Sequence, residues 1–209
     1  TDINRPKNQI FKVNVEGTRK VLELAQHLHA KGRLKKTNHI STAYIYGDYH
    51  GIFTEESLNV GQKFSNTYEE SKFQAELLVG EYRKQGLWID VYRPPIVIGD
   101  SKTGKTFQFK HIYQFINLCK LELFDTLPIQ GMHASVACID TLCDAIYMIS
   151  QKTQVKNKNY HPFPNAPVSI EHVIEAGAML MGFKKPRITA LKDFRTENFS
   201  PAQNILLRN

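Results

Sequence analysis

Short apolar stretches alternate along the chain with segments that have the apolar spacing of amphipathic helices. In the first helical segment, Val21, Leu24 and Leu28 share one face. Gly86 and Gly182 each follow a helical segment, where a left-handed residue commonly ends a helix. The expected helices span 14–30, 66–84, 141–150 and 169–181, and the expected strands end at 40–42 and span 88–92 and 134–139. Strands that alternate with helices of this length predict an α/β fold built on a parallel sheet.

The composition is that of a globular protein, with 42% apolar and 22% charged residues. No apolar stretch is long enough for a membrane span, and no signal-peptide pattern opens the sequence. The net charge of +7 favours acidic partners, but the basic residues are scattered and lack interleaved aromatics, which argues against nucleic acid. Three cysteines without a C-x-x-C pair predict reduced thiols in a cytoplasmic protein. The histidines lack metal-ligand spacing, so no metal site is expected.

One motif points to a different class of protein. Residues 99–106 read GDSKTGKT, which fits the P-loop pattern G-x-x-x-x-G-K-[ST]. In that interpretation Lys105 and Thr106 would bind the phosphates and magnesium of a nucleoside triphosphate. The context argues against it, because Pro94 and Pro95 would interrupt the central strand that precedes a P-loop. The interpretation therefore depends on whether another one explains more of the chain.

The other interpretation starts from Tyr68 and Lys72, which lie four residues apart in the second expected helix and share one face. An ammonium beside a phenol lowers the pKa of the phenol and makes it a general acid for carbonyl reduction. The same spacing also occurs on the surface of many helices. Upstream, the first expected strand ends in Ser41 and Thr42, at the edge where open α/β sheets bind ligands. The segment 92–99 ends the next strand at that same edge.

Taken together, these motifs resemble the extended short-chain dehydrogenase/reductases. The matching elements are Asn-Val-Glu-Gly-Thr at 14–18, Ser-Thr-x-x-x-Tyr-Gly at 41–47, Tyr-x-x-x-Lys at 68–72 and Arg-Pro-x-x-Val-x-Gly at 93–99. Within that group the chain is most similar to the thioester reductase branch, which includes the terminal reductase domains of carboxylic acid reductases and peptide synthetases, and to fatty acyl-CoA reductases. Because Gly-Asp-Ser-x-Thr-Gly is expected in that branch, the resemblance implies that the P-loop match is a coincidence.

The resemblance implies a reductase of acyl thioesters that uses NADP(H), with NAD(H) as the alternative, and yields an aldehyde or alcohol. Its substrate would be bound to CoA or to an acyl or peptidyl carrier domain. Thr42 would hydrogen-bond the substrate carbonyl, Tyr68 would donate the proton, and Lys72 would lower the pKa of Tyr68 and bind the nicotinamide ribose. The other implied cofactor contacts are Ser41, Pro95, Ile96 and Val97. Alternation along a strand turns Ser41 away from Thr42, which weakens its case.

The glycine-rich turn through which this group binds pyrophosphate is absent from the sequence. We therefore expect a Rossmann-like parallel sheet that lacks its N-terminal dinucleotide-binding half, plus a small C-terminal substrate subdomain. Residues 1–100 would form the Rossmann-like part, to which 133–152 return, and 101–209 the substrate subdomain. This organisation predicts a fragment of a longer reductase, truncated at both chain ends and inactive alone.

Two alternatives stay open at this point. An epimerase, dehydratase or ketone reductase of the same superfamily can use the same three side chains. A non-catalytic binding module derived from a reductase would keep the fold without the reaction.

Overall fold

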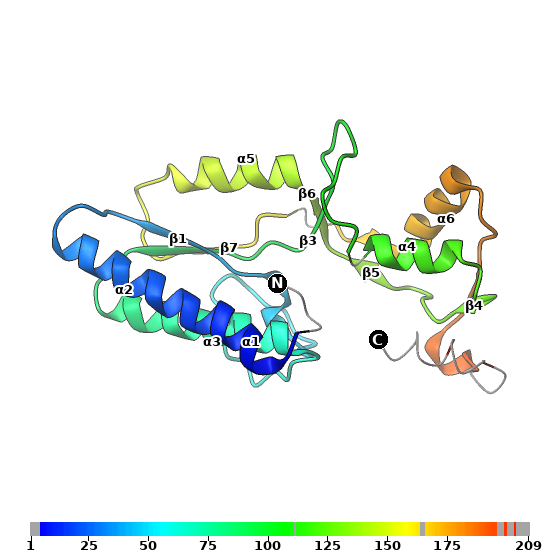
Figure 1. The fold of residues 1–209 in the computed structure, drawn as a ribbon, viewed down its shortest axis with the longest axis horizontal. Helices are drawn as coiled ribbons and strands as arrows, with labels where there is room; N and C mark the ends of the chain where they lie inside the picture. Colours follow the sequence, from blue (N-terminus) through cyan, green and yellow to red (C-terminus); the bar gives the residue numbers. More distant parts are fainter. Residues whose placement is uncertain (1–4, 111, 164–165, 196–198, 200–202, 204–209) are drawn as a thin grey trace. The chain divides into compact units, whose positions relative to one another are not determined.

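A computed structural model describes residues 5–110, 112–163, 166–195, 199 and 203 of the protein (Figure 1). The chain forms two compact units. One comprises Thr1–Val97 and Ile139–Phe163, and the other comprises Ile98–Cys138 and Pro164–Asn209.

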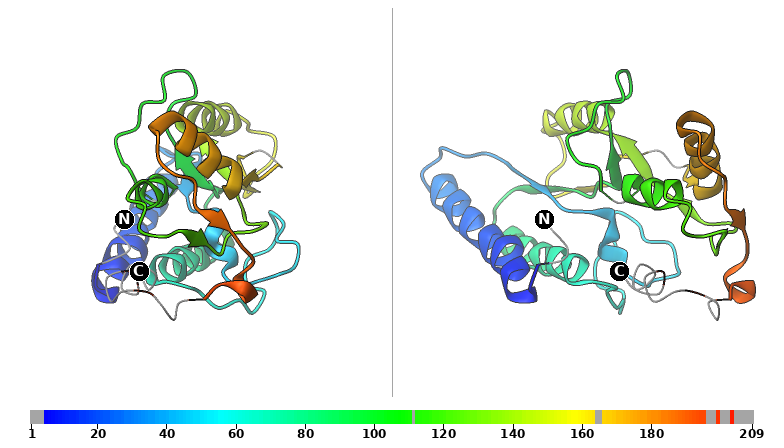
Figure 2. Two further views of the ribbon diagram at one scale, coloured as in Figure 1. Left: turned by 90° about the vertical axis from the view of Figure 1, so that its right-hand side faces the viewer. Right: turned by 45° about the vertical axis from the view of Figure 1, so that its right-hand side comes forward.

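The first unit is built on a parallel sheet in the order β1-β2-β7. Its helical elements are α1 (Lys7–Phe11), the π-helical turn η1 (Lys12–Glu16), α2 (Gly17–Ala30), the 3₁₀ turn η2 (Ala43–Tyr46), α3 (Thr67–Lys84) and α5 (Ile139–Ser150). Its strands are β1 (Thr37–Ile40), β2 (Ile89–Tyr92) and β7 (Asn159–Tyr160), and the short β3 (Ile96–Ile98) follows β2 and ends at the first residue of the second unit. Figures 1 and 2 show α2 and α3 on one face of this sheet and α5 on the other. The predicted α/β fold with a parallel sheet is confirmed.

The core of this unit joins the two helices to the central strand. All four residues of β2 are buried, as expected for a strand covered on both faces. The cluster consists of Leu22, Ala25, Leu78, Val79, Tyr82, Leu87, Ile89 and Val91. Burial of these side chains fixes α2 and α3 against β2.

The first helical region begins at Lys7, so the predicted start at residue 14 is wrong. Ile10 is 1% exposed, and Lys7 forms an ion pair of 2.8 Å with Glu70 of α3. The burial of Ile10 and the ion pair of Lys7 both depend on the tertiary fold. They extend the helical region towards the N-terminus, beyond the residues that show a helical apolar pattern. The π-helical turn η1 accommodates one extra residue per turn at this junction.

Other helix boundaries follow local signals. Asn66 begins α3, because its side chain accepts a hydrogen bond from the Glu69 backbone at 3.0 Å. Gly86, with φ of 93°, follows α3, and Gly182, with φ of 70°, ends α6 (Ile170–Met181), as predicted. The predicted strand 134–139 is instead two short strands, β5 (His133–Ala134) and β6 (Val136–Cys138).

The second unit contains short strands and two packed helices. Its remaining elements are α4 (Ile112–Lys120), β4 (Thr126–Leu127), β8 (Val168–Ser169), β9 (Arg187–Ile188) and the 3₁₀ turn η3 (Leu191–Asp193). β4 pairs with β9 in parallel, and β5 pairs with β8 in antiparallel. Its core cluster contains Cys119, Phe124, Leu127, Ile129, Ile174 and Phe183. Across the part of the chain that the structure describes, no helix combines the length and apolar character needed to cross a bilayer.

Candidate active site

The candidate site lies where β1 and β2 end. The Ser41 backbone N–H donates to the Tyr92 carbonyl at 2.7 Å, and the Ala43 N–H donates to the Pro94 carbonyl at 2.8 Å. Thr42 therefore sits between two main-chain bonds that continue the β1–β2 pairing past the strands. The carboxyl ends of both strands meet at one edge, where open α/β sheets place their ligands.

Thr42 is a buried hydroxyl with several neighbours. It is 4% exposed, and its Oγ1 accepts a bond from the Tyr44 N–H at 3.3 Å, which begins η2. The same hydroxyl donates a long bond of 3.5 Å to the Pro94 carbonyl. The strand-to-η2 turn thus fixes the position of this hydroxyl.

Tyr68 lies in the first turn of α3. Burial raises the pKa of Tyr68, the Thr42 side chain lowers it, and the Glu69 carboxylate raises it further. The structure therefore brings together two of the three predicted catalytic side chains, although they are 26 residues apart in the sequence.

Lys72 follows one turn later on α3. Its Nζ donates to the Ile40 carbonyl at 2.6 Å, at the end of β1. Burial lowers the pKa of Lys72, and the Glu76 carboxylate opposes this shift. The predicted effect of this ammonium on the pKa of Tyr68 stays a prediction.

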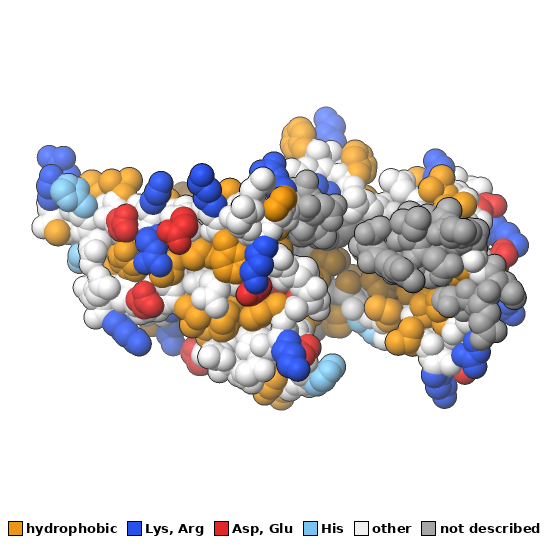
Figure 3. Space-filling model, turned by 60° about the horizontal axis from the view of Figure 1, so that its bottom comes forward, with side chains coloured by type: hydrophobic (Ala, Val, Ile, Leu, Met, Phe, Trp, Pro, Cys, Tyr) orange, Lys and Arg blue, Asp and Glu red, His pale blue; other side chains and the backbone are white. Residues whose placement is uncertain are grey.

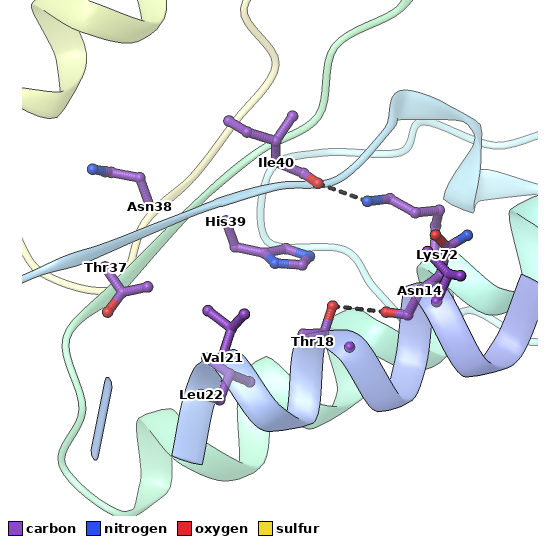
Figure 4. Close-up of a pocket in the computed structure, with 11 residues that line it drawn as sticks. Asn14, Thr18, Val21, Leu22, Thr37, Asn38, His39, Ile40 and Lys72 are labelled. Atoms are coloured by element: carbon purple, nitrogen blue, oxygen red, sulfur yellow. Dashed lines mark hydrogen bonds between the residues drawn. The ribbon is translucent and has the colours of Figure 1, made fainter. Parts of the chain in front are cut away.

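The other implied cofactor contacts lie at the same edge or just beyond it. Ser41 is 4% exposed, and its Oγ has no hydrogen-bond partner among the described residues. Pro95 is buried, Ile96 is half-buried, and Val97 is 40% exposed in β3. The Ser41 hydroxyl follows directly on Ile40, whose carbonyl accepts from Lys72 (Figure 4), and a free hydroxyl and an ammonium at one strand end are donors that fit ribose hydroxyls and a carboxamide. The residues present fit the nicotinamide half of a dinucleotide.

The sequence did not predict a chain of hydrogen bonds that connects the first helical region to the Tyr68 backbone. Asn14, in the π-helical turn, donates from Nδ2 to Ser71 Oγ at 2.9 Å, and that hydroxyl donates to the Tyr68 carbonyl at 2.8 Å. Ser71 is fully buried. Only the position of Asn14 within the motif at 14–18 could have indicated a special role.

A buried ion pair was also missed. Arg93 and Glu76 are 0% and 3% exposed, and the guanidinium contacts the carboxylate at 2.8, 3.1 and 3.2 Å. Arg93 also donates to the carbonyls of Thr54 and Glu55 at 3.4 and 3.3 Å, and its guanidinium lies 5.4 Å from the centre of the Phe53 ring. This network fixes the end of β2, from which Pro94 contacts Thr42.

The P-loop-like segment at 99–106 has its own internal partners. Asp100 Oδ1 accepts from the backbone N–H groups of Lys102 at 3.1 Å and Thr103 at 2.8 Å, and from the Thr103 hydroxyl at 2.8 Å. The Gly104 N–H donates to the Asp100 carbonyl at 2.8 Å. The Asp100 carboxylate thus accepts hydrogen bonds from backbone N–H groups of the kind that would bind phosphate in a P-loop. The next helix, α4, begins only at Ile112, so the geometry agrees with a coincidental match.

Across the described residues, no group of three or more His, Cys, Asp or Glu side chains is placed to hold a metal ion.

Comparison with known proteins decides the family. The family model named NAD_binding_4, described as male sterility protein, matches residues 1–146. The chain belongs to this family. A curated relative from Emericella nidulans, glycine betaine reductase ATRR, is 26% identical over 170 residues, which are 81% of this chain and 13% of that protein.

Two solved reductases share the fold. The terminal R domain of the myxalamid PKS-NRPS pathway has a TM-score of 0.74 at 23% identity, over 90% of this chain and 46% of that one. A thiolation-reductase di-domain from an archaeal non-ribosomal peptide synthetase has a TM-score of 0.76 at 21% identity, over 98% of this chain and 55% of that one. The chain thus spans about half the length of these structures.

The family model and these folds agree with the resemblance to extended short-chain dehydrogenase/reductases that the motifs led us to expect. The name of the matching family model refers to NAD binding, in agreement with the expected nicotinamide cofactor.

Proposed function

We propose that this member of the family carries the catalytic half of an NADP(H)-dependent reductase that acts on acyl thioesters. The observation that carries the proposal is the place of Thr42 at the carboxyl ends of two parallel strands, where its hydroxyl is fixed by Tyr44 and Pro94 and lowers the pKa of Tyr68. The two hydroxyls come from different elements of the fold, as polarisation and protonation of one carbonyl oxygen require.

Three residues of the chain would each have a separate role at the thioester carbonyl. The Thr42 hydroxyl would donate a hydrogen bond to the thioester oxygen in place of its long bond to Pro94. Tyr68 would transfer its proton to that oxygen, and burial supports this role because it keeps the phenol protonated. The bound nicotinamide would supply the hydride. Lys72, turned from the Ile40 carbonyl, would stabilise the resulting phenolate and hold ribose hydroxyls.

The chemistry balances as a two-electron reduction. The carbonyl carbon gains the hydride and its oxygen gains the Tyr68 proton, which gives a hemithioacetal. Cleavage of its carbon–sulfur bond then releases an aldehyde and a thiol. A second round of the same steps would give the alcohol.

The substrate proposal rests on charge and on the fold. The net charge of +7 favours an acidic carrier domain as the group that presents the thioester. One of the similar structures contains a thiolation domain joined to its reductase domain. A CoA thioester has the same thioester group, and its phosphates carry the negative charge that a basic protein would attract.

The test is a comparison of two tyrosine variants on α3, made in the protein as its gene encodes it. Tyr68→Phe should lower kcat/KM for NADPH-dependent thioester reduction by roughly 10²- to 10⁴-fold, the usual contribution of a general acid. Tyr82→Phe, which changes a core tyrosine on the same helix, should leave it unchanged.

Two outcomes contradict the proposal. Equal activity of the two variants would show that Tyr68 is no acid in the reaction. Conversion of a sugar nucleotide or ketone, without aldehyde or alcohol from any thioester, would favour the epimerase or ketone reductase alternative.

A further inference from the structure

The loop between β3 and α4, residues 99–110, is ordered by its own hydrogen bonds. The Asp100 N–H donates to the Lys105 carbonyl at 3.0 Å, which closes the turn. At the base of the loop, the Gly99 N–H donates to the Tyr113 hydroxyl of α4 at 2.8 Å. Figures 1 and 2 show that the loop extends away from the two elements that it joins. Its tip is therefore held in place by hydrogen bonds rather than by apolar burial.

Two phenylalanines follow the turn without being buried. Phe107 is 102% exposed, as much as in an extended peptide, and Phe109 is 64% exposed. The Phe109 ring has only an edge contact with Tyr113, at 5.5 Å between the ring centres. Single exposed apolar side chains are ordinary on a protein surface, but two aromatic rings within three residues form a patch that contributes nothing to the core. Such a patch indicates a surface that contacts another molecule.

The same loop is basic, with Lys102, Lys105 and Lys110 all exposed. From 101 to 121 the sequence has four lysines and no aspartate or glutamate. The Asp100 carboxylate, at the base of the loop, accepts hydrogen bonds from N–H groups of the loop itself. In Figure 3, the projection at the upper edge shows hydrophobic and basic side chains next to one another. The loop therefore presents aromatic rings within a positively charged surface, which fits a partner that is both apolar and anionic.

An anionic lipid surface combines these two properties. Lysines are attracted to its headgroups, and aromatic rings are favoured at the boundary between headgroups and acyl chains. The N–H groups of Asp100, Lys102, Thr103 and Gly104 are already bonded within the loop, so they would lose no partner on approaching lipid. A stable protein complex buries about 800 Å² on each partner, more than the few side chains of this tip supply. In a dimer of this chain through the same loops, like charges would face each other.

We propose that the β3–α4 loop binds the surface of a membrane that contains anionic lipid. Phe107 and Phe109 would enter the boundary between headgroups and acyl chains, and Lys102 and Lys105 would contact the headgroups. The contact is peripheral and reversible, because two rings and a few lysines give a weak attachment. The proposal holds whichever reaction the protein carries out, because no side chain of the candidate active site takes part.

The test is flotation of the protein, as its gene encodes it, with lipid vesicles. At low salt it should float with vesicles of phosphatidylcholine and phosphatidylserine, and not with vesicles of phosphatidylcholine alone. Phe107→Ser should weaken partition into the anionic vesicles by at least about tenfold, because a phenylalanine ring no longer leaves water. Lys105→Gln should weaken it by about fivefold, the usual effect of one lysine at an anionic surface.

Met179→Ser is the matched control for the loss of an exposed apolar side chain. Met179 is 81% exposed on α6, which has two glutamates and no lysine or arginine. Its replacement should leave the partition unchanged. Equal losses with Phe107→Ser and Met179→Ser would overturn the proposal, and so would the absence of flotation in the wild-type protein.

Insertion has a readout of its own. Phe107→Trp adds an indole to the loop, and its emission should shift to shorter wavelength on anionic vesicles and be quenched by brominated acyl chains, above the constant background of Trp88. Flotation with an unshifted and unquenched indole would overturn the insertion of this ring. Binding to soluble polyglutamate without flotation on any vesicle would overturn the proposal in favour of an acidic protein partner.

Discussion

The buried pair of Arg93 and Glu76 gives the sharpest stability prediction. Glu76→Gln keeps the shape of the side chain and removes its charge. Arg93 is fully buried and would retain its charge without the carboxylate that contacts it at 2.8 to 3.2 Å. Removing one member of a buried pair costs about 3–5 kcal/mol, because it leaves an uncompensated charge away from water.

Glu70→Gln is the matched control on the same helix. The Lys7–Glu70 pair has the same 2.8 Å separation, but its side chains are 62% and 34% exposed. An exposed pair contributes about 0–1 kcal/mol. At a urea dependence of about 2 kcal/mol per molar, Glu76→Gln should lower the unfolding midpoint by about 2 M and Glu70→Gln by at most about 0.5 M.

The assay is urea unfolding followed by the fluorescence of Trp88. This is the chain's one tryptophan, and it lies just before β2, so it reports on the unit that contains the pair. Replacing both Arg93 and Glu76 with Met should recover much of the loss, because no unpaired charge remains. Equal midpoints for the two single variants would refute the reasoning.

Three further predictions concern residues around the site. Gly47→Ala should destabilise the protein by about 1–3 kcal/mol in thermal unfolding, because φ at Gly47 is 55° and a Cβ there would clash with a main-chain carbonyl. The control Gly80→Ala, in α3, should be neutral or stabilising by up to about 1 kcal/mol. Glu69→Gln should shift the alkaline limb of kcat/KM to lower pH, because the carboxylate raises the pKa of Tyr68; an unshifted limb would contradict this. The pKa of His39 is lowered to about 3 by burial and by the charges of Lys72 and Arg83. Between pH 6.5 and 3 only the unfolded chain therefore takes up this proton, so the free energy of unfolding should decrease as the pH is lowered through that range. In urea unfolding at several pH values, His39→Gln should make this decrease smaller.

Local patterns in the sequence were sufficient to predict much of the fold and the elements on which the candidate residues Thr42, Tyr68 and Lys72 lie. The alternation of strands and helices, the cap at Asn66 and the glycine that ends α6 are determined within a few residues of sequence. The i, i+4 spacing of Tyr68 and Lys72 places them on one helix face in the same way. The position of Thr42 followed because strand ends of a parallel sheet share one edge.

The contacts that the sequence could not predict join distant segments. The start of α1 depends on burial of Ile10 and on a bond from Lys7 to α3, and neither leaves a periodic signal. The Asn14–Ser71 contact spans 57 residues and requires the π-helical turn. Lys72 bonds to the Ile40 carbonyl because that group lies at a free strand edge, which only the strand order reveals.

The central claim is that Tyr68 protonates a thioester carbonyl as a nicotinamide reduces it. The most direct measurement incubates the protein, as its gene encodes it, with an acyl thioester and NADPH deuterated at the transferred position. Mass spectrometry of the product should show one deuterium per aldehyde released by the wild-type protein and, in the same time, at least about a hundredfold less product with Tyr68→Phe. Dinucleotide binding without a deuterated product from any acyl thioester, or undiminished labelling by the variant, would contradict the claim.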